Sequence, residues 1–62
     1  MSSLVDEIYK DVAGYNGGLP WEAVHQRIEK IEDLSRGGAR KRFDKLAEAS
    51  LIHKTSAGLW AK

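Results

Sequence analysis

Hydrophobic residues recur at intervals of three and four in the first part of the chain, and this spacing predicts an amphipathic helix over about residues 3–14. Its apolar face is formed by Leu4, Val5, Ile8, Tyr9 and Val12. Ser3 and Asp6 have the spacing of a capping box, in which both side chains accept hydrogen bonds from main-chain amides of the first turn. Gly14 and the Asn-Gly-Gly sequence at 16–18 are expected to end this helix.

A second helix is expected over about residues 20–30, with Pro20 at its first position, where the missing N–H of proline costs no hydrogen bond. Leu19, just before it, is biased towards an extended conformation by the proline that follows. The apolar stripe of this helix, which we expect to lie in the core, consists of Trp21, Val24, Ile28 and Ile31. The residues expected to face away from the core are Ala23, Arg27 and Lys30.

A third helix is expected over about residues 35–49, with Ser35 as its N-cap. Its apolar positions are Ala39, Phe43, Leu46 and Ala47. Two short apolar runs at 51–54 and 59–62, joined by a four-residue link with glycine near its end, then predict a β-hairpin over about residues 51–62. The pattern as a whole predicts a mostly α fold with a small β-hairpin, in a single domain over residues 1–62.

Composition narrows the class of protein further. With 62 residues, 42% of them hydrophobic and 31% charged, the chain is typical of one small soluble globular domain rather than a disordered or fibrous protein. There is no cysteine, so disulfides and thiolate metal sites are excluded. The N-terminal stretch carries acidic residues and no long apolar run, so we expect neither a signal peptide nor membrane association. An intracellular location, cytoplasmic or nucleoid-associated, fits these features best.

The net charge is only +1, but acidic and basic residues are distributed unequally between the two halves of the chain. Residues 1–33 hold three basic and seven acidic side chains, whereas residues 34–62 hold seven basic and two acidic ones. Five of the ten basic residues lie within positions 36–45. Such asymmetry points to a polyanionic partner, although the acidic half could instead neutralise the basic half within the folded domain.

The order of elements resembles that of winged-helix domains: three helices, an extended residue between the first two, and a closing hairpin. The stretch LSRGGARKRFDKLAEASLI at 34–52 is similar to the recognition helix of that superfamily and the start of its wing. The resemblance implies a three-helix winged helix-turn-helix. One departure is Ser50, where such domains usually have glycine, so this residue is expected either to adopt a left-handed backbone or to leave the helix by a different exit.

Narrower resemblances point in two directions. GGLPWEAVHQRI at 17–28 and LIHKTSAGLW at 51–60 resemble the C-terminal winged helix of archaeal minichromosome-maintenance helicases, which is chiefly a regulatory and interaction module. SRGGARKR at 35–42 resembles the recognition helices of transcription factors more closely. Transcription and replication are therefore both open as contexts.

The charges on the third helix do not serve the stability of that helix. Its outward face begins basic and ends acidic, which opposes the helix macrodipole. Gly37 and Gly38 lower helix stability further. DNA binding would explain both features, because the first turns of a recognition helix lie nearest the bases and glycine lets the backbone approach closely. A solvated charged face, and a frayed helix start at the two glycines, are the simpler alternatives.

These considerations assign the candidate DNA contacts. The residues proposed for contact are Arg36, Gly37, Gly38, Arg40, Lys41 and Lys45 on the helix and Lys54, Thr55 and Ser56 on the wing. Arg36 and Arg40 are candidates for base edges or phosphates, and the lysines for phosphates. Arg42 lies closer to the core direction, so a packed stem with an internal ion pair is an equal alternative for it.

Other chemistry finds little support in the sequence. His25 and Glu29 share a helix face but do not make a metal site by themselves, and His53 is far away in the chain. Nothing resembles a nucleophile elbow or a phosphate-binding glycine fingerprint, so we expect no enzyme, no cofactor and no metal. Trp21 is expected in the core, and Trp60 is expected to pack beneath the hairpin rather than stack on a base.

The function that the sequence favours is a non-catalytic module that binds double-stranded DNA through the third helix and the wing. One alternative is a protein-interaction module of a larger replication protein, with the acidic first half of the chain meeting a basic partner. A second alternative is structured RNA as the ligand on the same basic surface. No helix is left over for dimerisation, so the isolated domain is expected to be monomeric.

Overall fold

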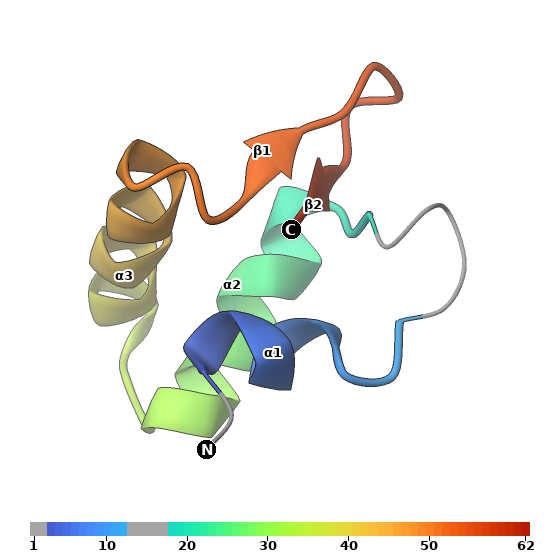
Figure 1. The fold of residues 1–62 in the computed structure, drawn as a ribbon. Helices are drawn as coiled ribbons and strands as arrows, with labels where there is room; N and C mark the ends of the chain where they lie inside the picture. Colours follow the sequence, from blue (N-terminus) through green and yellow to red (C-terminus); the bar gives the residue numbers. More distant parts are fainter. Residues whose placement is uncertain (1–2, 13–17) are drawn as a thin grey trace.

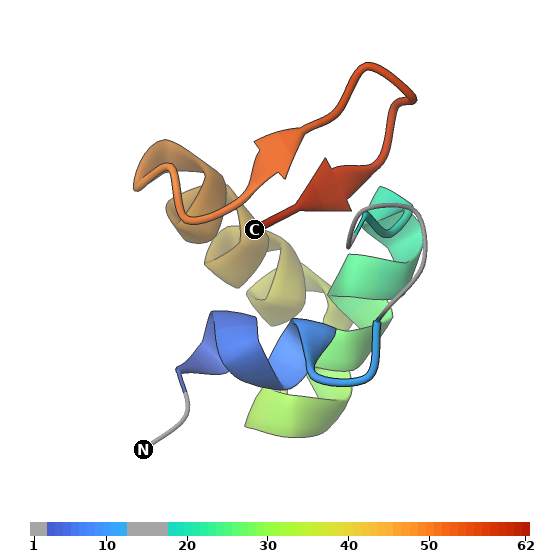
Figure 2. The same cartoon turned by 45° about the vertical axis from the view of Figure 1, so that its right-hand side comes forward.

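The computed structural model describes residues 3–12 and 18–62, and in these residues three helices are followed by one antiparallel hairpin (Figure 1). The elements are α1 (Leu4–Tyr9), α2 (Trp21–Glu32), α3 (Arg36–Glu48), β1 (His53–Lys54) and β2 (Trp60–Ala61). In Figure 2 the hairpin lies across one end of the helices, and α2 packs against both α3 and α1. The expected class, mostly helical with a small hairpin, is confirmed.

The start of α1 follows the sequence expectation, but its end does not. The capping box is present: the Ser3 amide donates to Asp6 Oδ2 at 3.3 Å, and the Asp6 amide donates to Ser3 Oγ at 3.2 Å. These bonds lower the pKa of Asp6 below its usual value. The helix ends at Tyr9 with Lys10 as its C-cap, so the prediction of helix to residue 14 was too long. Of the expected stop signals, Gly14, Asn16 and Gly17 lie outside the described residues.

The apolar stripe of α2 is buried only in its middle. Val24 and Ile28 are fully buried between the other helices, as expected. Trp21 is 45% exposed and Ile31 is 40% exposed, so the expectation that both lie in the core is wrong. They occupy the first and last turns of α2, and the core cluster formed with α1 and α3 covers only the turns between them.

Both ends of α2 differ slightly from the expected bounds of 20–30. Pro20 is the N-cap rather than the first helical residue, and the helix continues to Glu32. Asp33 then takes the left-handed conformation with φ of 52°, and the Leu34 amide donates to the Glu29 carbonyl at 3.1 Å. This is a tight exit, so only residues 33–35 separate α2 from α3.

Arg27 does not face away from the molecule, contrary to the sequence expectation. Its Nη1 donates to the Ile8 carbonyl at 2.7 Å and to Asp11 Oδ1 at 2.6 Å. The side chain is about one third exposed, so its stem lies against α1 while its charge reaches the open C-terminal end of that helix. The hydrogen bond and the charge of Arg27 lower the pKa of Asp11. Arg27 thus fixes α1 to α2.

At the end of α3, Ser50 adopts the left-handed backbone, one of the two alternatives that the sequence left open. Ser50 has φ of 60°, in the left-handed region where glycine is normally preferred. The Leu51 amide donates to the Leu46 carbonyl at 3.0 Å, and the Ser50 amide donates to the Ala47 carbonyl at 3.1 Å. This bond pair is the Schellman arrangement, which satisfies carbonyls at the helix end. The helix exit is therefore well formed despite the absence of glycine.

The hairpin is shorter than expected. Lys54 pairs with Trp60, and His53 pairs with Ala61, so residues 51 and 52 precede the strand rather than start it. Ile52 is buried, whereas Leu51 is exposed. The extended residue Leu19 pairs with the other edge of β2, with reciprocal bonds to the main chain of Trp60, both at 2.7 Å. This pairing fastens the α1–α2 connection to the hairpin.

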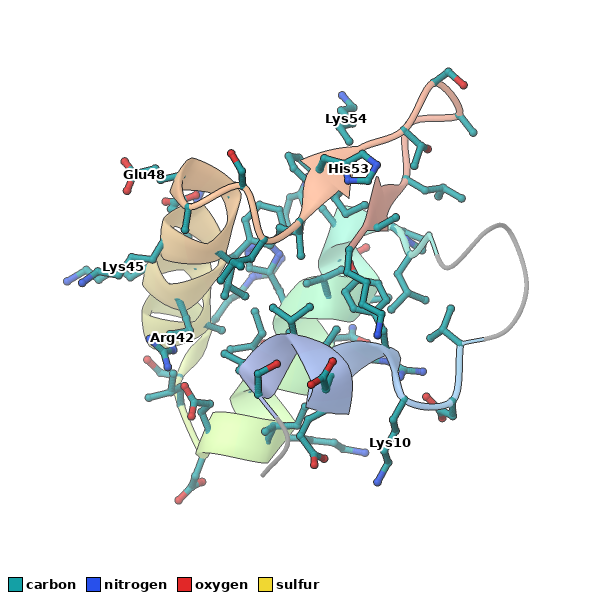
Figure 3. The ribbon with its side chains drawn as sticks, viewed as in Figure 1. Lys10, Arg42, Lys45, Glu48, His53 and Lys54 are labelled. Carbon is teal, nitrogen blue, oxygen red and sulfur yellow. The ribbon has the colours of Figure 1, made fainter. Side chains whose placement is uncertain are left out.

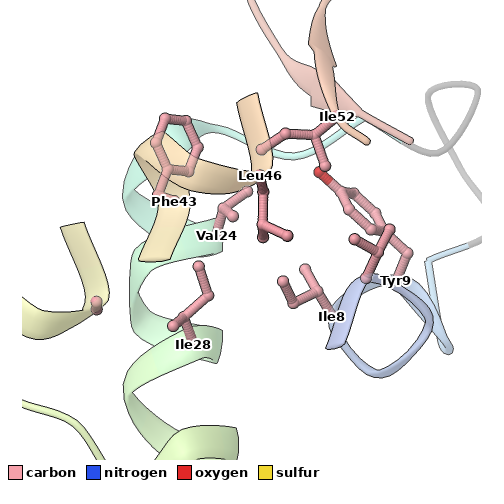
Figure 4. Close-up of a cluster of buried hydrophobic side chains, with 9 residues drawn as sticks. Ile8, Tyr9, Val24, Ile28, Phe43, Leu46 and Ile52 are labelled. Atoms are coloured by element: carbon pink, nitrogen blue, oxygen red, sulfur yellow. The ribbon is translucent and has the colours of Figure 1, made fainter. Parts of the chain in front are cut away.

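The core lies where the three helices meet the hairpin (Figure 4). Its buried members are Val5, Ile8, Tyr9, Val24, Ile28, Ala39, Phe43, Leu46 and Ile52. Figure 4 shows the Tyr9 hydroxyl directed from α1 towards the hairpin, where it donates to the Trp60 carbonyl at 2.9 Å. Trp60 itself packs on this cluster, with its ring edge-on to Phe43 at 4.9 Å between centroids, as expected.

Candidate nucleic-acid interface

The outward side of α3 carries the basic residues that the sequence singled out. Arg40, Lys41 and Lys45 are all exposed. In Figure 3, Lys45 and Glu48 project from α3 away from α2 and the rest of the molecule. None of these three basic residues forms an ion pair with any residue in 3–12 or 18–62. Their positive charge is therefore available to an external partner.

The other two arginines of α3 are paired with carboxylates of α2. Arg42 Nε donates to Glu32 Oε1 at 2.6 Å, with the arginine side chain 45% exposed. The ion pair in the alternative interpretation of Arg42 is therefore present, but the side chain is exposed rather than packed. Arg36 Nη2 lies 3.8 Å from Glu22 Oε1, and both side chains are about 70% exposed. A contact so open to water contributes little to stability and leaves Arg36 accessible.

The first turn of α3 contains both glycines, so the helix is formed there rather than frayed. Ser35 Oγ accepts from the Gly38 amide at 3.4 Å, which is the predicted N-cap. A Cβ at position 38 would lie 3.3 Å from Leu34 Cβ, whereas a Cβ at position 37 would meet nothing within 4 Å. Neither packing nor a positive φ requires glycine at 37. The exposed backbone of Gly37 is accordingly open to close approach from outside.

The first turn of α3 also contains no acidic residue. The amides at a helix N-terminus carry a partial positive charge, which acidic side chains commonly neutralise. Here Arg36 and Arg40 add to that charge instead. The beginning of α3 is therefore electropositive through both its backbone and its side chains.

The hairpin residues assigned to DNA contact have different roles in the fold. Lys54 and Ser56 are exposed, and Figure 3 shows Lys54 directed away from the hairpin and the helices. Thr55 is half-buried, and its Oγ1 accepts from the Leu59 amide at 3.2 Å. Its main chain also closes the turn, donating to the Leu59 carbonyl at 2.6 Å. Thr55 therefore shapes the turn, and part of the hydrogen-bonding capacity of its hydroxyl is already used within the hairpin.

One exposed residue beside this surface was missed by the sequence analysis. Trp21, at the start of α2, lines a hollow of about 90 Å³ together with His25, Arg40, Phe43 and Asp44. It also lines a more open hollow of about 410 Å³ with Pro20, Glu22 and Gly58 of the hairpin turn. The only sequence signal was its position next to Pro20, in a first helical turn that partner helices need not cover.

His25 is buried behind Trp21. Its ring stacks on Phe43 at 4.6 Å between centroids and meets the edge of Trp21 at 4.4 Å. Nδ1 lies 2.8 Å from the Trp21 carbonyl, and since a carbonyl only accepts, Nδ1 carries the hydrogen. Nε2 is buried and has no hydrogen-bond partner among the described residues. The buried imidazole of His25 therefore packs against the indole of Trp21 on the side that faces the core.

In residues 3–12 and 18–62, no group of three or more histidine, cysteine or acidic side chains has the arrangement to hold a metal ion. No helix in those ranges combines the length and the hydropathy needed to cross a bilayer.

Comparison with known proteins adds no assignment: no family model, no curated protein and no solved structure matches this chain. The function therefore has to be argued from the interface itself.

Proposed function

We propose that this chain is a winged-helix module that binds double-stranded DNA through α3 and the hairpin. The observation that carries the proposal is the exposed, unpaired set of Arg40, Lys41 and Lys45 beside the open backbone of Gly37. Three positive side chains on one element, without carboxylate partners in the described residues, suit the closely spaced phosphates of a duplex.

The connection between α2 and α3 supports the same proposal. A helix-turn-helix joins two helices by a turn of three or four residues and places the second helix in the major groove. Here three residues, 33–35, join α2 to α3, and both glycines of α3 lie in its first turn. Lys54 and Ser56 on the hairpin would then meet the sugar-phosphate backbone beside the groove, in the manner of a wing.

The pairing of Arg42 with Glu32 leaves Arg42 outside the proposed set of DNA contacts. Because Glu32 holds Arg42 at 2.6 Å, this arginine serves the α2–α3 junction rather than the ligand. Arg36 keeps its place in the set, since its 3.8 Å contact with Glu22 is exposed and easily exchanged for a phosphate. Arg36, Arg40, Lys41 and Lys45 remain the helix contacts, with Lys54 and Ser56 on the hairpin.

The test is a titration of the protein with a generic DNA duplex over a range of salt concentrations. Counterion release predicts that log K falls linearly with log salt, with a slope near −0.9 per phosphate neutralised. Lys41→Ala should reduce the magnitude of this slope by about 1. Lys30→Ala removes the same charge from an exposed position on α2 and should leave the slope almost unchanged.

Three results would contradict the proposal. Absence of binding at low salt would exclude the duplex as a ligand. Equal effects of Lys41→Ala and Lys30→Ala would show that net charge, and not this surface, attracts the DNA. Tighter binding to an RNA duplex than to DNA at matched salt would show that the surface is an RNA-binding one.

A second measurement maps the interface. Amide chemical-shift changes on adding DNA should be confined to residues 36–58 and to the neighbouring start of α2.

A further inference from the structure

The hollow beside Trp21 suggests a ligand more specific than a uniform duplex. Resting on the proposed function, we propose that Trp21 is a stacking platform for one unpaired nucleobase, so that the module prefers DNA with a bulged or flipped nucleotide. Among the described tryptophan, tyrosine and phenylalanine residues Trp21 is the most exposed, and it lines both the hollow towards α3 and the hollow towards the hairpin turn.

The size of the hollow towards α3 decides against an ordinary small-molecule site. At about 90 Å³ it is well below the roughly 300–1,000 Å³ that encloses a drug-sized ligand. The half-exposed Trp21 ring leaves one side of the site open to solvent. A flat ring that remains attached to a backbone outside the protein fits these limits, because only the ring itself has to enter.

The walls of the hollow provide the chemistry that a nucleotide needs. Trp21 offers an aromatic face, on which every base can stack. Arg40, exposed and without an ion pair in the described residues, offers a charge for the flanking phosphate. The Asp44 carboxylate offers an acceptor for an exocyclic amino group, which cytosine carries and thymine lacks.

The support behind Trp21 keeps the platform in place. His25 holds the indole edge-on from within, is itself stacked on Phe43, and is tied to the Trp21 carbonyl at 2.8 Å. An aromatic ring fixed in this way loses little conformational freedom when a base stacks on it, so most of the stacking energy appears as affinity. An exposed tryptophan free to rotate would lack this advantage.

The experiment compares three DNA probes at matched salt: a paired duplex, the same duplex with one bulged cytosine, and the same duplex with an abasic residue in the bulge. The two bulged probes carry the same backbone charge. The cytosine bulge should bind roughly 5- to 150-fold more tightly than the abasic bulge, the range expected for one base stacked on an aromatic side chain. A bulged thymine should bind less tightly than a bulged cytosine.

Two variants separate stacking from folding. Trp21→Leu keeps an apolar side chain but removes the aromatic face, and should abolish the preference for the base over the abasic site while leaving paired-duplex affinity within about twofold. Trp60→Phe leaves Trp21 as the sole tryptophan, whose fluorescence should be quenched by the cytosine bulge and not by the abasic bulge. The Trp60 main-chain bonds to Leu19 and Tyr9 are unaffected by that change.

The outcomes distinguish the two proposals. Binding to none of the probes overturns both. Binding to the paired duplex, with equal affinity for the cytosine and abasic bulges, overturns the stacking platform and leaves the duplex-binding function intact. Binding to the cytosine bulge alone supports the platform and overturns duplex binding as the main activity. A preference that survives Trp21→Leu also overturns the assignment to Trp21.

Discussion

The Tyr9 hydroxyl donates a hydrogen bond to the Trp60 carbonyl at 2.9 Å, joining the first helix to the last strand across 51 residues of sequence. The same carbonyl also accepts from the Leu19 amide at 2.7 Å. One main-chain oxygen of β2 therefore connects α1, the α1–α2 connection and the hairpin. In a domain this small, such a long-range bond is a substantial part of what holds the hairpin to the helices.

Removing this hydroxyl should weaken the fold by a predictable amount. Tyr9→Phe keeps the buried ring and removes one intramolecular hydrogen bond, which is worth about 0.5–1.5 kcal/mol. The loss stays within that range because the Trp60 carbonyl retains its bond from Leu19 and is not left unpaired. Urea unfolding of both proteins measures the difference. Equal free energies of unfolding would show that the bond is exchanged for water at no cost.

The same residue should make stability fall at alkaline pH. Burial raises the pKa of Tyr9 above its usual value of 10.0, outweighing the opposing effect of the Arg27 charge. The folded protein thus holds the phenolic proton more tightly than the unfolded chain does. The resulting stabilisation is fully present below pH 10 and is lost as the pH rises through the pKa of the folded state.

The measurement is the free energy of unfolding between pH 9 and 11 for the native chain and for Tyr9→Phe. The difference between the two proteins should shrink as the pH rises, since only the native chain carries this titrating group. Lysine deprotonation affects both proteins alike and cancels. A difference that stays constant over this range would contradict the role assigned to burial.

Ser50 should be a site where a single substitution stabilises the protein. Its φ of 60° costs a non-glycine residue roughly 1–2 kcal/mol, whereas glycine adopts it freely. Glycine also increases the freedom of the unfolded chain, which opposes the gain by about 0.4–1 kcal/mol. The net expectation for Ser50→Gly is a stabilisation of about 0.5–1 kcal/mol.

Ser50→Ala is the matched control. The Ser50 side chain is exposed and makes no hydrogen bond to any part of the chain that the structure describes, so alanine should change stability by less than about 0.5 kcal/mol. Thermal and urea unfolding measure the stability of the native chain, Ser50→Gly and Ser50→Ala. A destabilised Ser50→Gly would mean that the hydroxyl, and not the backbone angle, matters at this position.

The sequence predicted local features well because they depend on neighbouring residues alone. The Ser3–Asp6 capping box and the Ser35 cap are decided within a few positions, and both are confirmed. At Ser50 the sequence left two alternatives open, and the structure shows the left-handed one. Periodicity also identified the correct face of each helix. It could not say how far the partner helices extend, and for that reason Trp21 and Ile31 were wrongly placed in the core.

The ion pairs and the hollow of the candidate interface could not be predicted from the sequence, because they depend on how the helices pack against one another. The pairing of Arg27 with Asp11, and of Arg42 with Glu32, depends on how α2 packs against α1 and α3. The hollow between Trp21 and Arg40 forms only once α2 and α3 are in contact. Composition indicated a basic surface but not which of its charges are already neutralised within the fold.

The carboxylate of Glu22 should weaken DNA binding, because it competes with phosphates for Arg36. The carboxylate lies 3.8 Å from Arg36, next to the surface proposed to bind phosphates. Two unit charges about 4 Å apart interact by roughly 1 kcal/mol in water, so Glu22→Gln should tighten duplex binding by up to about fivefold at low salt. Stability should change by less than about 0.5 kcal/mol because the pair is exposed.

Glu29→Gln serves as the control for Glu22→Gln. It removes the same charge from α2, at a position without an ion pair among residues 3–12 and 18–62. Anisotropy titrations with one duplex, at two salt concentrations, compare the variants. Equal gains in affinity would attribute the effect to net charge. No gain for either would place Arg36 outside the binding surface.

A substitution at Gly37 should change the stability of the fold and the affinity for DNA in opposite directions. Nothing within 4 Å would contact an added Cβ, and the backbone has no positive φ, so Gly37→Ala should stabilise α3 by up to about 1 kcal/mol. If α3 enters the major groove with its first turn foremost, the same methyl group lies between the backbone and the DNA. Affinity for duplex DNA should then fall while the fold becomes more stable, a combination that damage to the structure cannot produce.

Gly38→Ala is the control, and because its Cβ would press on Leu34 at 3.3 Å it should gain less stability. A more stable Gly37→Ala protein that binds DNA as well as the native chain would show that the start of α3 does not approach the duplex closely.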